Sequence, residues 1–254
     1  MEFTDQFIIA AAGKDAIEVQ NAGLPCLNLA YSLTPRGGLQ CDRMVSNPRR
    51  SILGISNVRH TKTCENPSLL SDDILSAVKR LGFSGVFADL EEPLAAGILP
   101  VLDAVLHKHG IPLFVPCFKT VYTSHAFITI ETAISGGIFR EYVREYTETY
   151  AHIAAQVTPV SAEFLLPAQD AAGTPVSRED IARRIREQNA SVFFSSELCC
   201  NYFTFTDSEQ KGHFVIFDDA RTLQKKVSIL QEAGIGHIFI VYPHFLEYIK
   251  EQAG

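Results

Sequence analysis

Residues 82–93 read Gly-Phe-Ser-Gly-Val-Phe-Ala-Asp-Leu-Glu-Glu-Pro, and this stretch indicates how the chain folds. A run of mostly apolar residues leads into two carboxylates, Asp89 and Glu91, and Pro93 follows them. Because side chains alternate between the two faces of a strand, we expect Phe87, Asp89 and Glu91 to share one face. Acids at the carboxyl end of a buried strand are typical of a (β/α)8 barrel, where functional residues lie at that end.

On both sides of this stretch, short apolar runs alternate with longer amphipathic runs. This alternation is typical of βα units around a parallel sheet. The 254 residues also match the length of one (β/α)8 barrel, roughly 250 residues. We therefore predict an α/β fold with strands at 7–11, 24–31, 51–56, 83–89, 113–117, 127–133, 163–168 and 237–242, and helices at 71–81, 99–109, 140–156, 177–188 and 220–233.

We predict one domain over residues 1–254, because no repeat, low-complexity tract or Pro/Ser-rich linker divides the chain. A small β insertion is expected at about 191–218, before the last helix. Its hairpin should turn near 207–212, where Asp, Ser and Gly supply turn chemistry.

Composition narrows the function classes. The net charge is −7 and no dense Lys/Arg run occurs, which argues against nucleic acid and anionic membranes as partners. No apolar stretch reaches the length of a membrane helix, and the acidic start at residues 2 and 5 is unlike a secretory signal. We expect a cytoplasmic protein, with export by another route left open.

Cofactor and metal motifs are absent from the sequence. It contains no phosphate-binding loop, no dinucleotide-binding glycine motif and no nucleophile elbow. The six cysteines fit no zinc spacing, so we expect reduced thiols, no metal and no cofactor. The oligomeric state is left open.

The acid pair can support catalysis. Two carboxyls a few ångström apart push their pKa values apart, so that one can stay protonated and act as a general acid. The structural alternative is a pair of strand-end acids that cap a helix or pair with an arginine.

The same stretch resembles the fourth-strand signature of glycoside hydrolase family 18, the chitinase-like barrels, written D-G-x-D-x-D-x-E. It matches at Gly85, Asp89 and Glu91 and departs at Ser84 and Phe87, where the family usually has Asp. Residues 24–31 with 37–39 resemble the family's second strand and its turn. Residues 217–226 with 233–236 resemble the last helix and eighth strand of its spore-germination and cortex-lytic branch.

This resemblance implies a bacterial enzyme that hydrolyses N-acetylglucosamine-containing glycans with retention, using the substrate's own acetamido group as nucleophile. Glu91 would be the general acid, and Asp89 would orient and stabilise the acetamido group. The implied partner is a carbohydrate such as a peptidoglycan or spore-cortex fragment, and association with spores is a further expectation.

Two features of the family are missing. Residues 127–137 lack the Tyr-Asp pair of the sixth strand, and the chain contains no Trp to form the floor of the sugar subsite. Tyr242 and Tyr31 are candidates for part of that aromatic role.

Other candidate substrate-binding residues each have a structural alternative. Glu131 could contact substrate or form a salt bridge at the barrel rim. Asn28 is a site residue or a satisfied core amide, and Tyr202 walls a cleft or packs within the hairpin. Arg59, His60 and Lys62 could bind an anion or a sugar hydroxyl, or lie in a solvated loop.

Three functions follow from these patterns. The first is the glycosidase described above. The second is a non-catalytic sugar-binding or scaffold barrel that keeps the acid pair by descent, which the missing aromatic and Tyr-Asp residues favour. The third, a barrel enzyme acting on a phosphorylated metabolite, requires an anion loop after strands seven and eight. No Gly-rich anion loop occurs near residues 167–173 or 242–244.

Overall fold

The computed structural model describes residues 7–34, 38–41, 51–56, 64–167, 173–244 and 246. The chain divides into two compact units. The first, here called the barrel unit, comprises Met1–Ile130, Tyr150–Gln156 and Gly236–Tyr242, and the second, the sheet unit, comprises Glu131–Thr149, Val157–Ile235 and Pro243–Gly254. The organisation as one domain stays a prediction.

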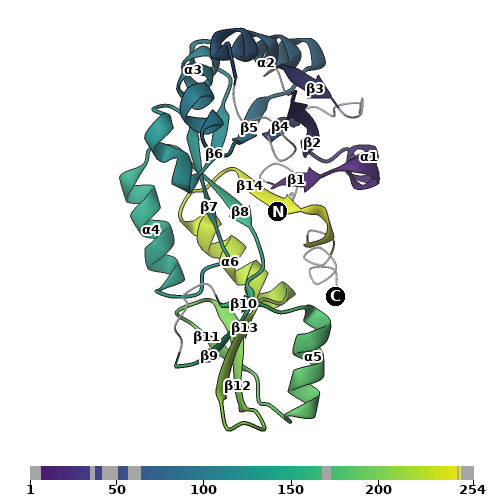
Figure 1. The fold of residues 1–254 in the computed structure, drawn as a ribbon, viewed down its shortest axis with the longest axis vertical. Coiled ribbons are helices and arrows are strands. Elements are labelled where there is room, and N and C mark those ends of the chain that lie inside the picture. Colours follow the sequence, from purple (N-terminus) through teal and green to yellow (C-terminus); the bar gives the residue numbers. More distant parts are fainter. Residues whose placement is uncertain are drawn as a thin grey trace. The chain divides into compact units, whose positions relative to one another are not determined.

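Within the described residues, eight parallel strands close into a barrel in the order β1-β14-β8-β7-β6-β5-β4-β2, and pairing of β1 with β2 completes the circle (Figure 1). This confirms the predicted (β/α)8 architecture. The short strand β3 (Leu39–Cys41) pairs antiparallel to β2. The barrel strands are β1 (Phe7–Ala11), β2 (Cys26–Leu33), β4 (Ile52–Ser56), β5 (Gly85–Asp89), β6 (Leu113–Pro116), β7 (Phe127–Glu131), β8 (Ile153–Val157) and β14 (Ile238–Val241).

Helices connect these strands, and their ends follow local chemistry. The α2 helix begins where the side chain of Asn66 accepts a hydrogen bond from Leu69 N, and it ends at Gly82, which takes the left-handed conformation at φ 75°. No helix in the described part of the chain is long and apolar enough to cross a membrane. The helices that follow barrel strands are α1 (Gly13–Asn21), α2 (Pro67–Leu81), α3 (Leu94–Lys108), the 3-10 helix η1 (Cys117–Tyr122) and α4 (Phe139–Thr149), and α6 (Ala220–Glu232) precedes β14.

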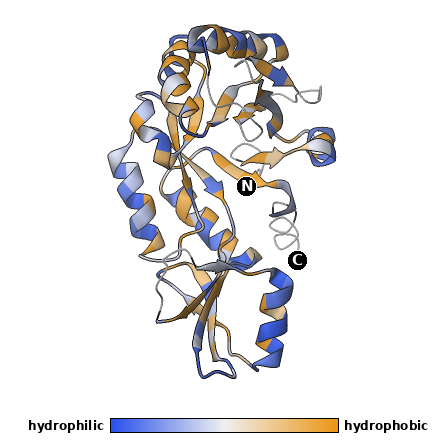
Figure 2. Cartoon of the chain, viewed as in Figure 1, coloured by the Kyte–Doolittle hydropathy of each residue, from blue (hydrophilic) through white to orange (hydrophobic). Residues whose placement is uncertain are grey.

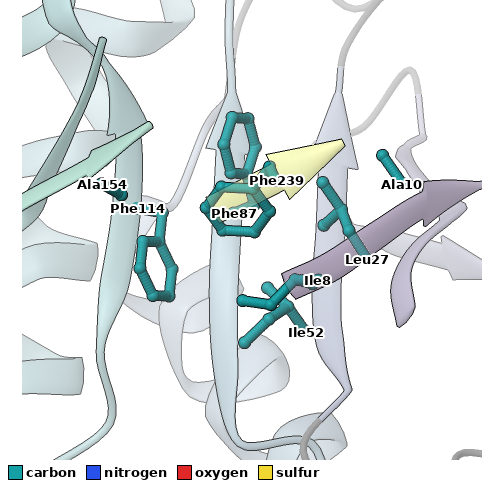
Figure 3. Close-up of a cluster of buried hydrophobic side chains, with 8 residues drawn as sticks. All are labelled: Ile8, Ala10, Leu27, Ile52, Phe87, Phe114, Ala154 and Phe239. Carbon is teal, nitrogen blue, oxygen red and sulfur yellow. The ribbon is translucent and has the colours of Figure 1, made fainter. Parts of the chain in front are cut away.

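Apolar side chains fill the interior of the barrel. Phe87 and Phe114 each meet Phe239 edge to face, with ring centroids 5.2 and 5.1 Å apart. Phe87 therefore belongs to the core, where a carboxylate in its place would be buried without a partner. The cluster consists of Ile8, Ala10, Leu27, Ile52, Phe87, Phe114, Ala154 and Phe239 (Figure 3).

The sheet unit contains an antiparallel sheet of five described strands, ordered β10-β9-β13-β12-β11. Helix α5 (Arg178–Glu187), which is largely hydrophilic in Figure 2, places Ile181 against one face of this sheet, beside Phe203 and Val215. The predicted hairpin turn is confirmed, because Asp207 N donates to Lys211 O at 3.0 Å. The strands are β9 (Ser161–Leu166), β10 (Thr174–Pro175), β11 (Phe193–Ser195), β12 (Cys200–Thr206) and β13 (Gly212–Phe217).

One predicted barrel strand was wrong. Residues 163–166 of the strand predicted at 163–168 lie in β9 of the antiparallel sheet. The seventh barrel strand is β8, which overlaps the end of the helix predicted over 140–156. That helix, α4, ends at Thr149. The strand Ile153–Val157 is short and rich in Ala, a residue that favours helices, so tertiary pairing overrides local propensity there. The insertion also starts earlier than predicted, at Ser161.

Candidate active site

Strand β5 carries Asp89 to the carboxyl end of the barrel. Phe87 points into the barrel core, so Asp89, two residues further, lies on the same inner face, beside Ser56 of β4. Asp89 is exposed, and Glu91 is exposed in the connection to α3, after the buried Leu90. Phe87 thus fills the core below the acid pair and leaves both carboxylates open to solvent.

The surroundings of Asp89 shift the pKa of its carboxyl. Although Asp89 is exposed by surface area, surrounding atoms desolvate part of its carboxyl and raise its pKa above the ordinary value. The charge of Glu91 adds to this rise, and the ammonium of Lys119 opposes it. Asp89 is therefore a carboxyl whose raised pKa follows from its surroundings.

Lys119 is a site residue that the sequence did not predict. It lies in η1, directly after β6, and is 6% exposed. Its Nζ is 2.9 Å from Oε1 of Glu92, and Tyr122 donates a hydrogen bond to the same carboxylate. The hydrogen bond from Lys119 lowers the pKa of Glu92. The ammonium held in this way stabilises the ionised form of Asp89 from the end of the neighbouring strand.

Replacing Lys119 by Met is expected to raise the pKa of Asp89 further, because the ammonium stabilises the ionised carboxylate. If the ionised Asp89 is the working form, the acid limb of the pH–rate profile moves to higher pH. Carbon-13 NMR titration of the Asp89 carboxyl measures the change directly, with exposed Lys108→Met as the control. An unchanged Asp89 titration would show that Lys119 does not act on it.

Two predicted site residues, Asn28 and Tyr31, lie on the outer face of β2. Leu27 points into the core, so Asn28 points outward, where it is 1% exposed. The pairing of β2 with β4 is irregular between Asn28 and Tyr31, which turns Tyr31 outward as well, edge to face with Phe83 at 5.8 Å. Burial raises the pKa of Tyr31 to about 12. Both side chains therefore point away from the barrel interior that Asp89 faces.

The two other predicted substrate-binding residues on barrel strands or just after them, Tyr242 and Glu131, are half-buried and exposed, respectively. Tyr242 follows β14, and its hydroxyl donates to Oε2 of Glu18 on α1 at 2.7 Å. Glu131 is the last residue of β7 and is exposed. Arg59, His60 and Lys62 lie outside the described residues.

Polar residues that were not predicted also face the barrel interior. Thr129 of β7 is 2% exposed, and its hydroxyl has no hydrogen-bond partner among the described residues. Gln156 of β8 lies two residues after Ala154, a member of the core cluster, and so shares its face. Gln156 was missed because the sequence placed it in a helix.

Tyr202 belongs to a row of aromatic rings on the sheet unit. Its ring centroid is 5.6 Å from Phe193 and 5.5 Å from Phe214, and Phe214 is 6.2 Å from Phe164. The row lies on the face of the sheet opposite to α5, since Phe203 and the other partners of α5 alternate with these residues. Phe193, at the edge strand, is 55% exposed.

No cluster of three or more His, Cys, Asp or Glu residues in the described ranges could hold a metal ion. All six cysteines are free thiols. Two exposed carboxylates with a buried lysine beside them are the charged groups gathered at the end of β5.

Comparison with known proteins shows similarity of structure alone. No protein-family model and no curated protein sequence matches the chain. A chitinase from Chromobacterium violaceum has a TM-score of 0.64 at 14% identity, covering 93% of both chains. The Bacillus cereus spore cortex-lytic enzyme SleL has a TM-score of 0.62 at 14% identity, covering 96% of this chain and 74% of its own.

A third similar structure contains a bound sugar. A class V chitinase from Nicotiana tobaccum, a Glu-to-Gln variant in complex with the oligosaccharide NAG4, has a TM-score of 0.58 at 12% identity and covers 92% of each chain. This chain therefore has the fold of solved chitinases and spore cortex-lytic enzymes.

Proposed function

We propose that the protein is a divergent family-18-like glycosidase that hydrolyses N-acetylglucosamine-containing glycans. The observation that carries the proposal is the pair of exposed carboxylates, Asp89 and Glu91, at the carboxyl end of the fourth strand of a chitinase-like barrel. Spore-cortex glycan is one source of such a substrate, since SleL acts on spore cortex by its name.

In the proposed reaction, Glu91 donates its proton to the glycosidic oxygen as the bond from that oxygen to the anomeric carbon breaks. The carbonyl oxygen of the sugar's own acetamido group attacks the anomeric carbon and forms a cyclic cation. Ionised Asp89 accepts a hydrogen bond from the acetamido N–H and stabilises the positive charge of the cyclic cation. Water, deprotonated by the Glu91 carboxylate, then attacks the anomeric carbon and restores both the acetamido group and the acid, with net retention.

A non-catalytic sugar-binding barrel is the second candidate. It is favoured by the absence of Trp and by Phe87, which replaces a carboxylate and packs in the core. Both candidates predict binding of chitooligosaccharides, but only the first predicts product.

Incubation with chitooligosaccharides separates the two candidates. Chromatography of products and calorimetric titration of the same samples would be compared. We expect shorter oligosaccharides with retained anomeric configuration. Binding without product would support the second candidate, and neither binding nor product would contradict both.

At the edge of the aromatic row, Phe193 is exposed and Tyr202 is half-buried, so these two rings offer faces on which a sugar ring can stack. We expect Tyr202→Ala to weaken chitooligosaccharide binding about tenfold. Phe205→Ala is the matched control, since Phe205 is on the same strand but packs on the opposite face with the α5 cluster. Calorimetry measures both, and equal losses would indicate a general effect on the sheet.

A further inference from the structure

A pocket of about 490 Å³ lies within the sheet unit, and none of its lining residues belongs to the proposed catalytic site. Helix α5 forms one wall. The other walls are formed by the residues just before β9, the first residue of β9, the end of β13 and the start of α6. Sites for small molecules in proteins have volumes of roughly 300–1,000 Å³. The pocket is therefore large enough to hold a molecule with more than one ring.

Most of the pocket wall is apolar. Ile185 of α5 and Phe217 of β13 are half-buried and pack against the cluster of Ile181, Phe203 and Val215, which joins the helix to the sheet. This cluster holds the two walls in place on either side of the pocket. The apolar lining residues are Pro159, Val160, Ile181, Ala182, Ile185, Phe217 and Ala220.

The most buried polar side chain of the lining is that of Asp218, which is 5% exposed. One of its carboxylate oxygens accepts from Val160 N at 2.8 Å and from Lys226 Nζ at 2.7 Å, and the other accepts from the Thr222 hydroxyl at 2.7 Å. The ammonium of Lys226 also balances its charge. Asp218 is therefore satisfied within the protein, and a ligand need not supply a donor to it.

The carboxylate of Asp219 and the hydroxyl of Ser161 are likewise hydrogen-bonded within the sheet unit. Asp219 accepts from Thr222 N and from Asn201 Nδ2, both at 2.8 Å, one at each oxygen. Ser161 Oγ donates to Val176 O at 2.5 Å. The polar part of the wall thus serves contacts within the protein.

A wall of this composition favours an uncharged ligand. A charged group that entered would lose part of its hydration, and the lining carboxylates already have donors of their own. An apolar molecule loses no hydrogen bond on entering, and it removes its own surface and that of the wall from water. Arg178, the remaining polar lining residue, is exposed in the first turn of α5 and also has an interaction within the structure. An anion paired with Arg178 is the alternative that the experiment has to exclude.

We propose that this pocket binds a neutral, mainly hydrocarbon molecule with a flat ring system, between α5 and the end of β13. The ligand ring lies against Ile185 and contacts the ring of Phe217. Ala182 is exposed, so it marks the side of the pocket that is open to solvent. The site is separate from the acid pair, and it does not depend on the proposed glycosidase activity.

The test uses probes that share a naphthalene ring and differ in charge: neutral 2-naphthol, anionic 2-naphthoate and cationic 2-naphthylmethylammonium. Each is titrated at neutral pH into nitrogen-15-labelled protein. We expect 2-naphthol to give saturable shifts of the Ala182, Ile185 and Phe217 backbone amide signals, with a dissociation constant on the order of a millimolar or below. Both charged probes should bind at least about fivefold more weakly.

Ala182→Trp should weaken the binding of 2-naphthol about tenfold or more, because the indole occupies volume that the ligand needs. Ala104→Trp, the same change at an exposed position of α3, is the matched control and should leave binding unchanged. Ala182→Asp is a second variant that keeps the pocket open but adds a charge to its wall, and it should also weaken binding. Circular dichroism checks that each variant is folded.

Absence of saturable shifts at the Ala182, Ile185 and Phe217 amides of the wild-type protein would overturn the proposal. So would equal binding of 2-naphthol by Ala182→Trp and the wild type. Tighter binding of 2-naphthoate would assign the pocket to anions held by Arg178, and tighter binding of the ammonium probe would assign it to cations held by the carboxylates. Either of these results would overturn the assignment to neutral molecules.

Discussion

Replacing Glu91 by Gln is expected to lower kcat on a chromogenic chitobioside by about a hundredfold to ten-thousandfold. Glutamine has nearly the same shape as glutamic acid, but its amide cannot supply a proton to the leaving oxygen or take one from water. Glu91 is exposed and follows the end of β5, so the substitution does not change the packing of the barrel core. The thermal unfolding midpoint should therefore stay close to that of the wild type.

The control is Glu65→Gln, the same change at an exposed residue shortly before α2, and it should leave kcat unchanged. Asp89→Asn should also lower kcat, because a neutral amide no longer stabilises positive charge on the acetamido group. If Glu91→Gln hydrolyses the substrate at the wild-type rate, Glu91 is not the general acid. Initial rates at saturating substrate, measured across the pH range, separate these results.

The barrel could be predicted from sequence because most of its strands are apolar on both faces and are bounded by clear helix signals. The fourth strand shows this well, since Gly82 ends α2 and the run to Asp89 pairs as expected. The seventh strand could not be predicted in the same way. Ile153–Val157 has weak strand propensity, and only its pairing within the barrel makes it a strand.

The candidate site could be predicted only where side-chain alternation is regular. Asp89 follows the core residue Phe87 by two positions, so its direction follows from the pattern. Tyr31 follows an irregularity in the pairing of β2, which reverses its direction and is invisible in the sequence. Lys119 was missed because no local pattern distinguishes a buried lysine in a short 3-10 helix from a solvated one.

The segment 217–226, which resembled the last helix of a known family, contains a buried ion pair. Lys226 and Asp218 have fully buried side chains, with Nζ 2.7 Å from Oδ2. The ammonium also donates to Thr132 O at 2.9 Å. Asp218 in turn accepts from Val160 N at 2.8 Å and from the Thr222 hydroxyl at 2.7 Å. One pair thereby connects the residues after β7, those before β9 and the first turns of α6.

Asp218→Ala is expected to lower the free energy of unfolding by about 3–5 kcal/mol, because it leaves the Lys226 ammonium buried without its counter-ion. It also leaves the buried Val160 N without its acceptor. Lys226→Met should cost less than this, since its side chain stays apolar and similar in length while Asp218 keeps two donors. Urea denaturation followed by circular dichroism measures both.

The control is the pair of Arg140 and Glu232, which are 2.8 Å apart in the same unit but have side chains 63% and 59% exposed. Glu232→Ala should change the free energy of unfolding by less than about 1 kcal/mol, because water solvates both charges and screens their attraction. The double variant Asp218→Ala/Lys226→Met should be more stable than the sum of the single changes predicts, since it leaves no buried charge uncompensated. Additive losses, or a loss for Asp218→Ala as small as that for Glu232→Ala, would show that the buried pair does not hold these three segments together.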